Sequence, residues 1–361
     1  MKQLEAFRQS EAVLVIADRI NRLSGLPVTF MEVCGGHTMT LHKNGLLSLL
    51  PGQMSLISGP GCPVCVSGQG FIDALIRILE DPSVILVTYG DLLRIPSGEQ
   101  SLEKKRASGA DIRVVYSVME ALDLAKRHPG NQIVFAGIGF ETTAPLTAAA
   151  VLKARADRLT NFSVYSAHKV MPPALHWIAS NSPSINGFIA PGHVTAITGT
   201  SIYEQLVREY PVGVVVAGFE PVDMMLALLK LTEQAKTGHF RVENAYPRVV
   251  RNEGNPKARV MMEEVFEPAD DRWRGLGSIP GSGLRLRTAF ADFDAKRILG
   301  VEEQAIPEPI GCICGDVITG RSKPPQCKLF GTVCTPETPV GACMVSSEGT
   351  CAIWNKYGSR H

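Results

Sequence analysis

Nine cysteines carry most of the chemistry that this sequence could perform, and three of them lie in its first third. Cys34 stands alone, whereas Cys62 and Cys65 share the segment 59–65, Gly-Pro-Gly-Cys-Pro-Val-Cys. This segment follows a short apolar run and precedes apolar residues at helical spacing, so we expect the pair at a helix N-terminus. The helix dipole and free backbone N–H groups favour a thiolate there. The alternative is that two inert, buried cysteines happen to lie three residues apart. We favour a reactive or metal-binding pair, able to form a disulfide.

The other six cysteines form a C-terminal group between residues 312 and 351. No histidine occurs among them, and the close cysteine pairs that are usual in structural zinc sites are absent. Four thiolates from separate loops favour a [4Fe–4S] cluster, which leaves two cysteines for a redox pair. A zinc site with four cysteine ligands is the alternative. The spacing alone does not select the four ligands among Cys312, Cys314, Cys327, Cys334, Cys343 and Cys351.

Composition argues against several classes of partner. The chain has 361 residues, and its 36 basic and 35 acidic side chains give a net charge of +1. Neither nucleic acid nor an anionic membrane surface is expected to bind such a balanced chain. The longest uncharged stretch is interrupted by prolines, and the N-terminus carries charges that a signal peptide would lack. We therefore expect a cytoplasmic protein, in which cysteines serve metal or redox chemistry more often than structural disulfides.

The remaining sequence predicts an α/β fold. An amphipathic helix within residues 1–27 precedes eight β-branched runs that alternate with helical segments, which is typical of parallel sheets. These runs are 28–33, 54–58, 84–88, 112–116, 132–136, 162–166, 187–190 and 212–217. Similar short motifs recur about 100 residues apart, which favours two pseudo-repeated four-strand domains at 28–130 and 131–238. Residues 239–361 are expected to form a linker region and a smaller C-terminal iron–sulfur domain.

Ligands of parallel α/β sheets bind at the carboxyl ends of the strands, and several reactive residues follow predicted strands. Cys34 and His37 follow the first, Cys62 and Cys65 the second, and His193 the seventh. A single His or Glu in such a place is more often structural, and this applies to Asp91, Glu141, His168 and Glu220. No complete dinucleotide fingerprint and no P-loop is present. We expect one crevice that brings together Cys34, the 59–65 loop and His193.

Several motifs resemble those of the HypD family of nickel–iron hydrogenase maturation proteins. They are Cys-Gly-Gly-His-Thr at 34–38, the 59–65 segment, Gly-Phe-Glu-Thr-Thr-Ala-Pro at 139–145, Pro-Gly-His at 191–193, Ala-Gly-Phe-Glu-Pro at 217–221 and the tail at 335–351. The resemblance implies a cytoplasmic scaffold that works with a HypC-like chaperone and a HypE-like cyanide donor to assemble an Fe(CN)2CO unit. It implies that Cys34 holds the iron, that Cys62 and Cys65 act at the same site, and that His193 faces it.

The tail is also similar to that of ferredoxin–thioredoxin reductase. This similarity implies that Cys312, Cys327, Cys334 and Cys351 hold the cluster and that Cys314 and Cys343 form a redox pair. It also suggests an alternative function, a stand-alone thiol–disulfide oxidoreductase. Cys34 is a third crevice thiol with no resolving partner in its own motif, so we favour an assembly scaffold with redox activity over a dedicated oxidoreductase.

Overall fold

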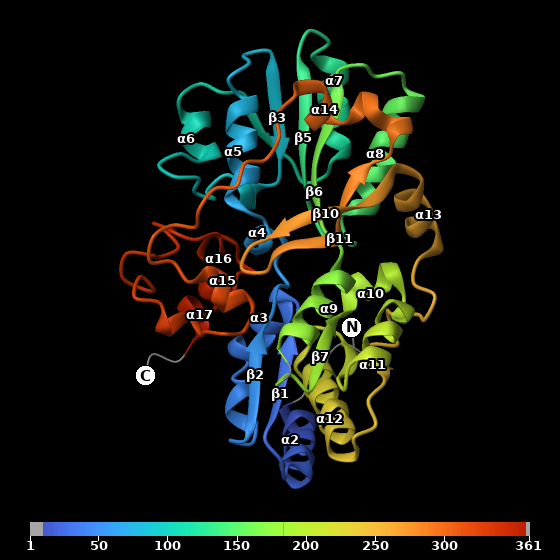
Figure 1. Ribbon diagram of the computed structural model, residues 1–361, viewed down its shortest axis with the longest axis vertical. Coiled ribbons are helices and arrows are strands. Elements are labelled where there is room, and N and C mark those ends of the chain that lie inside the picture. The colour runs from blue at the N-terminus through green and yellow to red at the C-terminus, as the bar shows by residue number, and fades with distance from the viewer. Residues whose placement is uncertain (1–9, 183, 359–361) are drawn as a thin grey trace.

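Two parallel sheets and a loop-rich C-terminal region make up the computed structural model, which describes residues 10–182 and 184–358. Figure 1 shows one sheet in the upper half and the other in the lower half, with the C-terminal region at the side of their junction. The largest apolar core contains residues of all three parts, among them Leu86, Phe188 and Val317. The parts therefore pack as one body.

The lower sheet has five parallel strands in the order β2-β1-β7-β8-β9. Alternate residues of its strands face opposite sides: Phe30 and Val215 pack with α2 and α12, while Met31 and Val214 face α9 and α11. The strands are β1 (Val28–Glu32), β2 (Met54–Ser58), β7 (Gly187–Pro191), β8 (Gly213–Ala217) and β9 (Val242–Asn244). The helices around them are α2 (Ser10–Leu23), α3 (Gly35–Lys43), η1 (Leu46–Leu49), α9 (Met171–Asn181), α10 (Gly192–Thr198), η3 (Thr200–Tyr203), α11 (Glu204–Glu209) and α12 (Pro221–Thr237).

The upper sheet has four parallel strands in the order β4-β3-β5-β6. Its two central strands, β3 and β5, are almost wholly apolar because helices cover both faces. The four strands are β3 (Val84–Thr88), β4 (Ile112–Val114), β5 (Gln132–Gly139) and β6 (Phe162–His168). The surrounding helices are α4 (Pro63–Val66), α5 (Gln69–Ile78), η2 (Gly90–Leu92), α6 (Leu102–Ala107), α7 (Met119–Arg127) and α8 (Ala144–Ala156).

The strand pairing differs from the expected division of the chain at residue 130. All eight expected strands form, but β1 and β2 share a sheet with β7 and β8, in which β1 pairs with β7. The upper sheet takes all of its strands from 84–168. Both sheets place their strands in the order second, first, third, fourth, with β9 added to the lower one. A repeat is thus present in topology, but its units are not consecutive halves. Apolar runs show where strands form, and they do not show which strands pair, because parallel connections vary in length.

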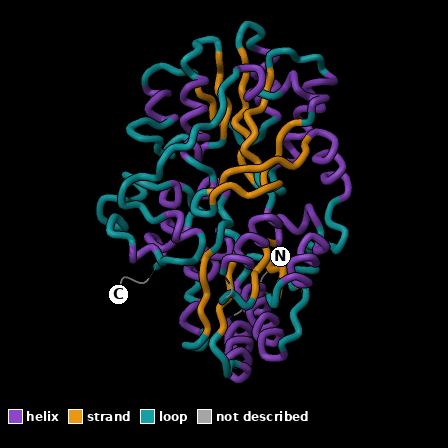
Figure 2. Tube along the Cα trace, viewed as in Figure 1, coloured by secondary structure: helices purple, strands orange, loops and turns teal. Residues whose placement is uncertain are grey.

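The region expected to be a linker contains an ordered hairpin. Helix α13 (Pro256–Val265) leads into the antiparallel strands β10 (Phe266–Trp273) and β11 (Gly277–Leu286), followed by η4 (Thr288–Phe293) and α14 (Ala295–Leu299). Figure 2 shows that loops dominate the C-terminal region beyond it. Its short helices are α15 (Cys314–Ile318), η5 (Pro324–Gln326), α16 (Ala342–Val345) and α17 (Thr350–Tyr357). Among the described residues, no helix has the length and apolar character needed to cross a membrane.

Candidate functional site

A cavity of about 330 Å3 lies where the carboxyl ends of the two sheets meet. The lower sheet contributes Cys34 after β1 and His193 after β7, and the upper sheet contributes the residues that follow β3 and β5. Gly61, Pro63 and Val64 of the 59–65 loop also line the cavity, and Glu348 enters from the C-terminal region. The expected crevice of Cys34, the 59–65 loop and His193 is therefore confirmed.

Glycines allow three segments to meet around Cys34. A Cβ on Gly61 would lie 2.2 Å from the backbone nitrogen of Cys34, so the 59–65 loop rests directly on the end of β1. A Cβ on Gly36 would lie 2.9 Å from the Phe219 ring, and one on Gly35 would lie 2.2 Å from the carbonyl oxygen of Glu348. Any larger residue at these positions would push the neighbouring segment away from the thiol.

Cys34 is the N-cap residue of α3 and its thiol is free. Burial raises the pKa of this thiol to about 12, and the Glu348 and Glu32 carboxylates add to the rise. Backbone N–H groups of Gly36 and His37 act in the opposite direction without cancelling it. The general expectation of a thiolate at a helix N-terminus is therefore wrong for Cys34, because desolvation and two carboxylates outweigh the helix. A bound cation would reverse this balance by displacing the proton.

Glu32 lies beneath this thiol and is almost fully buried. Its carboxylate accepts hydrogen bonds from the Cys34 backbone N–H at 3.1 Å and from the Thr38 hydroxyl. Burial raises the pKa of Glu32 to about 8 despite these hydrogen bonds. The pKa of Glu348 is also raised, chiefly by burial and further by Asp91. Glu32 can thus take up or release a proton near neutral pH beside the thiol, and Glu348 keeps its proton to a higher pH than an exposed glutamate does.

His193 stacks on one side of an aromatic group that the sequence analysis did not single out. Its ring centroid lies 4.1 Å from that of Phe219, and the His37 ring lies 4.8 Å from the same phenyl ring. Burial lowers the pKa of both imidazoles, to about 4 for His37. Only His193 lines the cavity, whereas His37 is buried with its Nε2 at 3.4 Å from the Ala217 carbonyl oxygen. A neutral imidazole therefore faces the crevice beside Cys34.

The other polar residues at strand ends divide into one crevice residue and three structural ones. Asp91 lines the cavity and accepts a hydrogen bond from the Ser346 hydroxyl at 3.0 Å. Glu141 accepts the Met171 backbone N–H, His168 pairs with the Thr147 hydroxyl, and Glu220 forms the capping box of α12. These three positions follow the structural interpretation given above for a single His or Glu.

Cys62 and Cys65 form a disulfide in this structure, as expected for a pair that can bond. Cys62 is the N-cap residue of the four-residue helix α4, and both side chains are buried. Their loop lines the crevice, but neither sulfur does. A disulfide offers no thiolate to a metal, so in this state Cys34 is the crevice thiol that could bind iron. Helix α4 also packs against α15 and α16, which places the disulfide next to the C-terminal cysteines.

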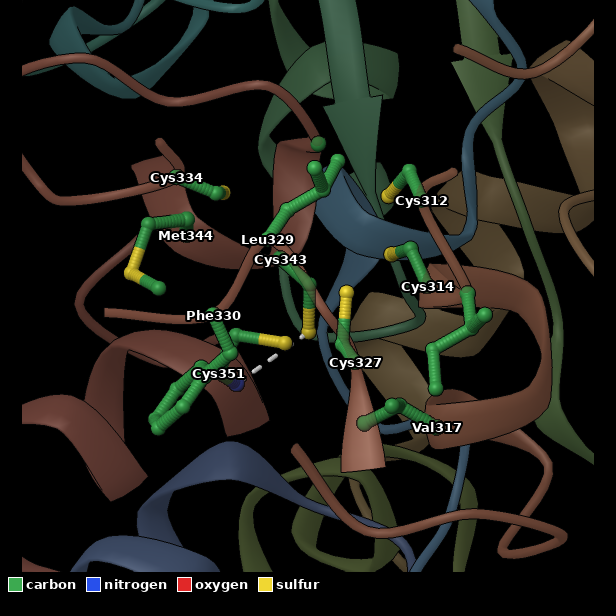
Figure 3. Close-up of a pocket in the computed structure, with 12 residues that line it drawn as sticks. Cys312, Cys314, Val317, Cys327, Leu329, Phe330, Cys334, Cys343, Met344 and Cys351 are labelled. Atoms are coloured by element: carbon green, nitrogen blue, oxygen red, sulfur yellow. Dashed lines mark hydrogen bonds between the residues drawn. The ribbon is translucent and has the colours of Figure 1, made fainter. Parts of the chain in front are cut away.

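All six C-terminal cysteines line a second, smaller cavity, and Figure 3 shows their sulfur atoms pointing toward its centre. They come from three helices and two loops. The rest of the lining consists of Ile313, Val317, Leu329, Phe330, Gly341 and Met344. The Cys314 side chain is within hydrogen-bonding reach of both Cys312 and Cys343, and the Cys351 backbone N–H lies 3.4 Å from the Cys343 sulfur. The hydrogen bond with Cys314, followed by burial, raises the pKa of Cys312.

The donor set indicates which metal group this second cavity suits. Among residues 10–182 and 184–358, no three His, Cys, Asp or Glu side chains converge on a point where one ion could be held. A four-iron cluster has a different requirement, because each thiolate binds a separate iron and the ligands surround a volume. Six inward-pointing sulfurs in an apolar lining fit this requirement in type and arrangement.

Sequence reasoning missed Glu348 as a crevice residue and Phe219 as the ring on which His193 stacks. Glu348 stands in the cysteine-rich tail and Phe219 after β8, so each belongs to a motif but carries no signal of its own. The signal lay in Gly35 and Gly36, since paired glycines beside a functional cysteine indicate that other segments approach closely. The sequence could not identify those segments.

Comparisons with known proteins find relatives that match almost the whole chain. The HypD family model, described as the hydrogenase formation hypA family, matches residues 11–358. The hydrogenase maturation factor HypD2 of Bradyrhizobium diazoefficiens is 45% identical, over 99% of this chain and 97% of its own length. HypD of Cupriavidus necator is also 45% identical, over 99% of this chain and 97% of its own. A putative hydrogenase expression/formation protein of Methanocaldococcus jannaschii is 42% identical, over 94% and 95%. The chain belongs to the HypD family of hydrogenase maturation factors.

Proposed function

We propose that this chain is a scaffold on which the Fe(CN)2CO unit of a nickel–iron hydrogenase is assembled. Iron is the cargo, Cys34 is the thiol that holds it, and a HypC-like chaperone and a HypE-like cyanide donor act on it at the crevice. We further propose a [4Fe–4S] cluster held by Cys312, Cys327, Cys334 and Cys351, with Cys314 and Cys343 as a redox pair. The family match and the two cavities support these roles.

The observation that carries the proposal is one free thiol in a cavity of about 330 Å3 at the meeting point of two sheets. Low-spin iron with cyanide and carbon monoxide ligands favours a soft sulfur donor. Iron binding requires the Cys34 thiol to lose its proton. The Glu32 and Glu348 carboxylates raise the pKa of this thiol, so they oppose the loss until a cation binds. His193 offers a ring N–H to a ligand on the iron, because its imidazole lines the same cavity.

The second cavity supplies the redox part of the proposal. Its all-sulfur donor set would hold the cluster, which supplies electrons when bound. The cysteines adjoin α4, whose disulfide must take up two electrons and two protons to become the Cys62 and Cys65 dithiol. Once reduced, both thiols become available beside the crevice, and the 59–65 loop already rests on Cys34.

Infrared spectroscopy tests the scaffold directly. The protein, purified anaerobically with its chaperone partner, should show cyanide and carbon monoxide stretches. The Cys34→Ala variant should lose these bands and support no hydrogenase maturation, yet keep the visible absorption of the cluster and its fold. If the bands persist in Cys34→Ala, the iron is held elsewhere and the proposed role of Cys34 is wrong.

A stand-alone thiol–disulfide oxidoreductase is the second candidate, and the Cys62–Cys65 disulfide favours it. Such an enzyme would turn over a disulfide substrate without Cys34. Substrate reduction that is unchanged in Cys34→Ala, together with the absence of diatomic-ligand bands in the wild type, would support this candidate over the scaffold.

A further inference from the structure

The tip of the β10–β11 hairpin, residues 273–277, lies between the disulfide helix α4 and the C-terminal cysteines. Trp273 and Ser67 form an isolated antiparallel β-bridge. The backbone N–H of Arg274 donates to the Val66 carbonyl oxygen at 2.7 Å. On the other side, a Cβ on Gly275 would lie 2.5 Å from the carbonyl oxygen of Gly315, the residue after Cys314. The tip therefore contacts the end of α4 and the beginning of α15.

Arg274 places a charged side chain inside this junction. Only 1% of the side chain is exposed, one guanidinium nitrogen donates to the Ser67 carbonyl oxygen at 3.1 Å, and another pairs with Glu308. Its Nε is buried without a hydrogen-bond partner within the described part of the chain. Burying a cation is costly unless its surroundings compensate for the lost water. The carbonyl oxygen and one carboxylate compensate only in part.

Glu308 does not neutralise this charge fully. Its side chain is 40% exposed, so water screens the carboxylate, whereas the guanidinium is shielded from water. The next residue, Gly275, packs against Gly315 beside Cys314, so the buried charge of Arg274 lies close to the cysteine cavity. Its positive field thus reaches the cavity that contains the six sulfurs.

We propose that Arg274 is a positioning residue with two effects: its buried positive charge raises the reduction potential of the cluster beside Cys312 and Cys314, and its hydrogen bonds hold α4 against that cluster. The inference rests on the proposed cluster and concerns a residue to which neither the family match nor the sequence motifs assign a role. One-electron reduction adds one negative charge to the cluster. A buried cation stabilises that added charge, whereas a neutral side chain in the same place would not.

A reductive titration with dithionite, followed by the visible absorption and the electron paramagnetic resonance signal of the cluster, measures this effect. Arg274→Gln removes the charge and should make cluster reduction at least tenfold less favourable, or about 59 mV lower for a one-electron couple. Arg274→Lys keeps a cation and should restore most of the potential. Arg272→Gln is the matched control, because Arg272 is exposed on the same hairpin and should leave the potential unchanged.

Glu308→Gln provides an independent test with the opposite sign. Removal of the carboxylate leaves the Arg274 cation less compensated, so the potential should rise, by less than Arg274→Gln lowers it because Glu308 is partly exposed. Equal potentials in the wild type, Arg274→Gln and Glu308→Gln, at equal iron and sulfide content, would overturn the inference. If Arg274→Gln fails to fold or load a cluster, a potential that is unchanged or lowered in Glu308→Gln overturns it. A wild-type protein with no iron–sulfur cluster would instead refute the proposed function.

Discussion

The crevice and the C-terminal cavity both depend on cysteine, yet their surroundings differ in kind. In the crevice one free thiol shares about 330 Å3 with carboxyl groups, an imidazole and polar loop residues. In the C-terminal cavity six sulfurs face one another across an apolar lining. A mixed set of donors permits proton movement and the entry of small ligands, which suits cargo that must be built and released. An all-sulfur apolar set suits a group that stays in place.

The disulfide helix α4 connects these two environments. Its loop lines the crevice through Gly61, Pro63 and Val64, while the helix itself packs against α15 and α16. Because α4 has only four residues, it has little internal stability, and its position depends on what packs around it. We therefore expect substitutions in one cavity to leave the other cavity intact. Substitutions at the seam, where Gly35 of the crevice meets Glu348 of the C-terminal region, should affect both.

The largest expected effect is loss of the cluster on removal of one of its proposed ligands. Cys334→Ser should abolish the visible absorption and the acid-labile sulfide of the anaerobically purified protein, because one iron loses its thiolate. Cys34→Ser should leave both unchanged. Iron and sulfide analysis of the two variants checks this contrast. If Cys334→Ser binds as much sulfide as the wild type, Cys334 is not a cluster ligand. If the wild type contains zinc and no sulfide, the structural zinc site is the correct alternative.

Substitution of Cys62 or Cys65 by serine should abolish hydrogenase maturation without loss of the cluster. Alkylation of the unreduced, denatured wild type should label its seven free cysteines, whereas Cys62→Ser should label eight, since its remaining partner is released. Either serine variant should fail to support hydrogenase maturation while it keeps wild-type cluster absorption. Normal maturation by Cys62→Ser or Cys65→Ser would show that the disulfide is only structural.

These contrasts also show how far the sequence alone could lead. Apolar β-branched runs are sufficient to predict strands, and strand ends are sufficient to predict that Cys34 and His193 share a crevice, because both are local properties. Strand pairing is not local, so the interleaved sheets could not be predicted. The same holds for Glu348, which reaches the crevice from a loop more than 300 residues after Cys34. The raised pKa of Cys34 could not be predicted either, because it depends on burial and on the Glu348 and Glu32 carboxylates, which no motif reports.

A substitution at the seam should weaken both regions at once. Gly35→Ala would place a Cβ 2.2 Å from the carbonyl oxygen of Glu348, a backbone atom that cannot turn aside as a side chain can. The C-terminal region must shift, at a cost of about 1–3 kcal/mol in the free energy of unfolding. Gly52→Ala is the matched control, because nothing lies within 4 Å of its Cβ position, and it should change stability by less than about 0.5 kcal/mol. Denaturant titration of both variants checks this expectation. If Gly35→Ala and Gly52→Ala are equally stable, Gly35 and Glu348 are not closely packed.

A last expected effect is a change in the pH dependence of stability, caused by the Glu32 carboxyl group next to the Cys34 backbone N–H. Burial raises the pKa of Glu32 from 4.5 to about 8. Between pH 4.5 and pH 8, Glu32 is therefore protonated in the folded state and ionised in the unfolded state. Folding is therefore stabilised by this group at low pH, and the stabilisation is lost as the pH rises toward 8, by at most about 1.4 kcal/mol per pH unit. Glu32→Gln keeps the size of the side chain and one acceptor oxygen for the Cys34 N–H, and its NH2 group can donate to the Thr38 hydroxyl, but it cannot ionise. The stability difference, wild type minus variant, should thus fall steadily from pH 5 to pH 8. Other buried groups, such as His37 and Glu141, are common to both proteins and cancel in this difference. Parallel stability profiles would mean that Glu32 is ionised in the folded protein and that the crevice is far more polar than its burial indicates.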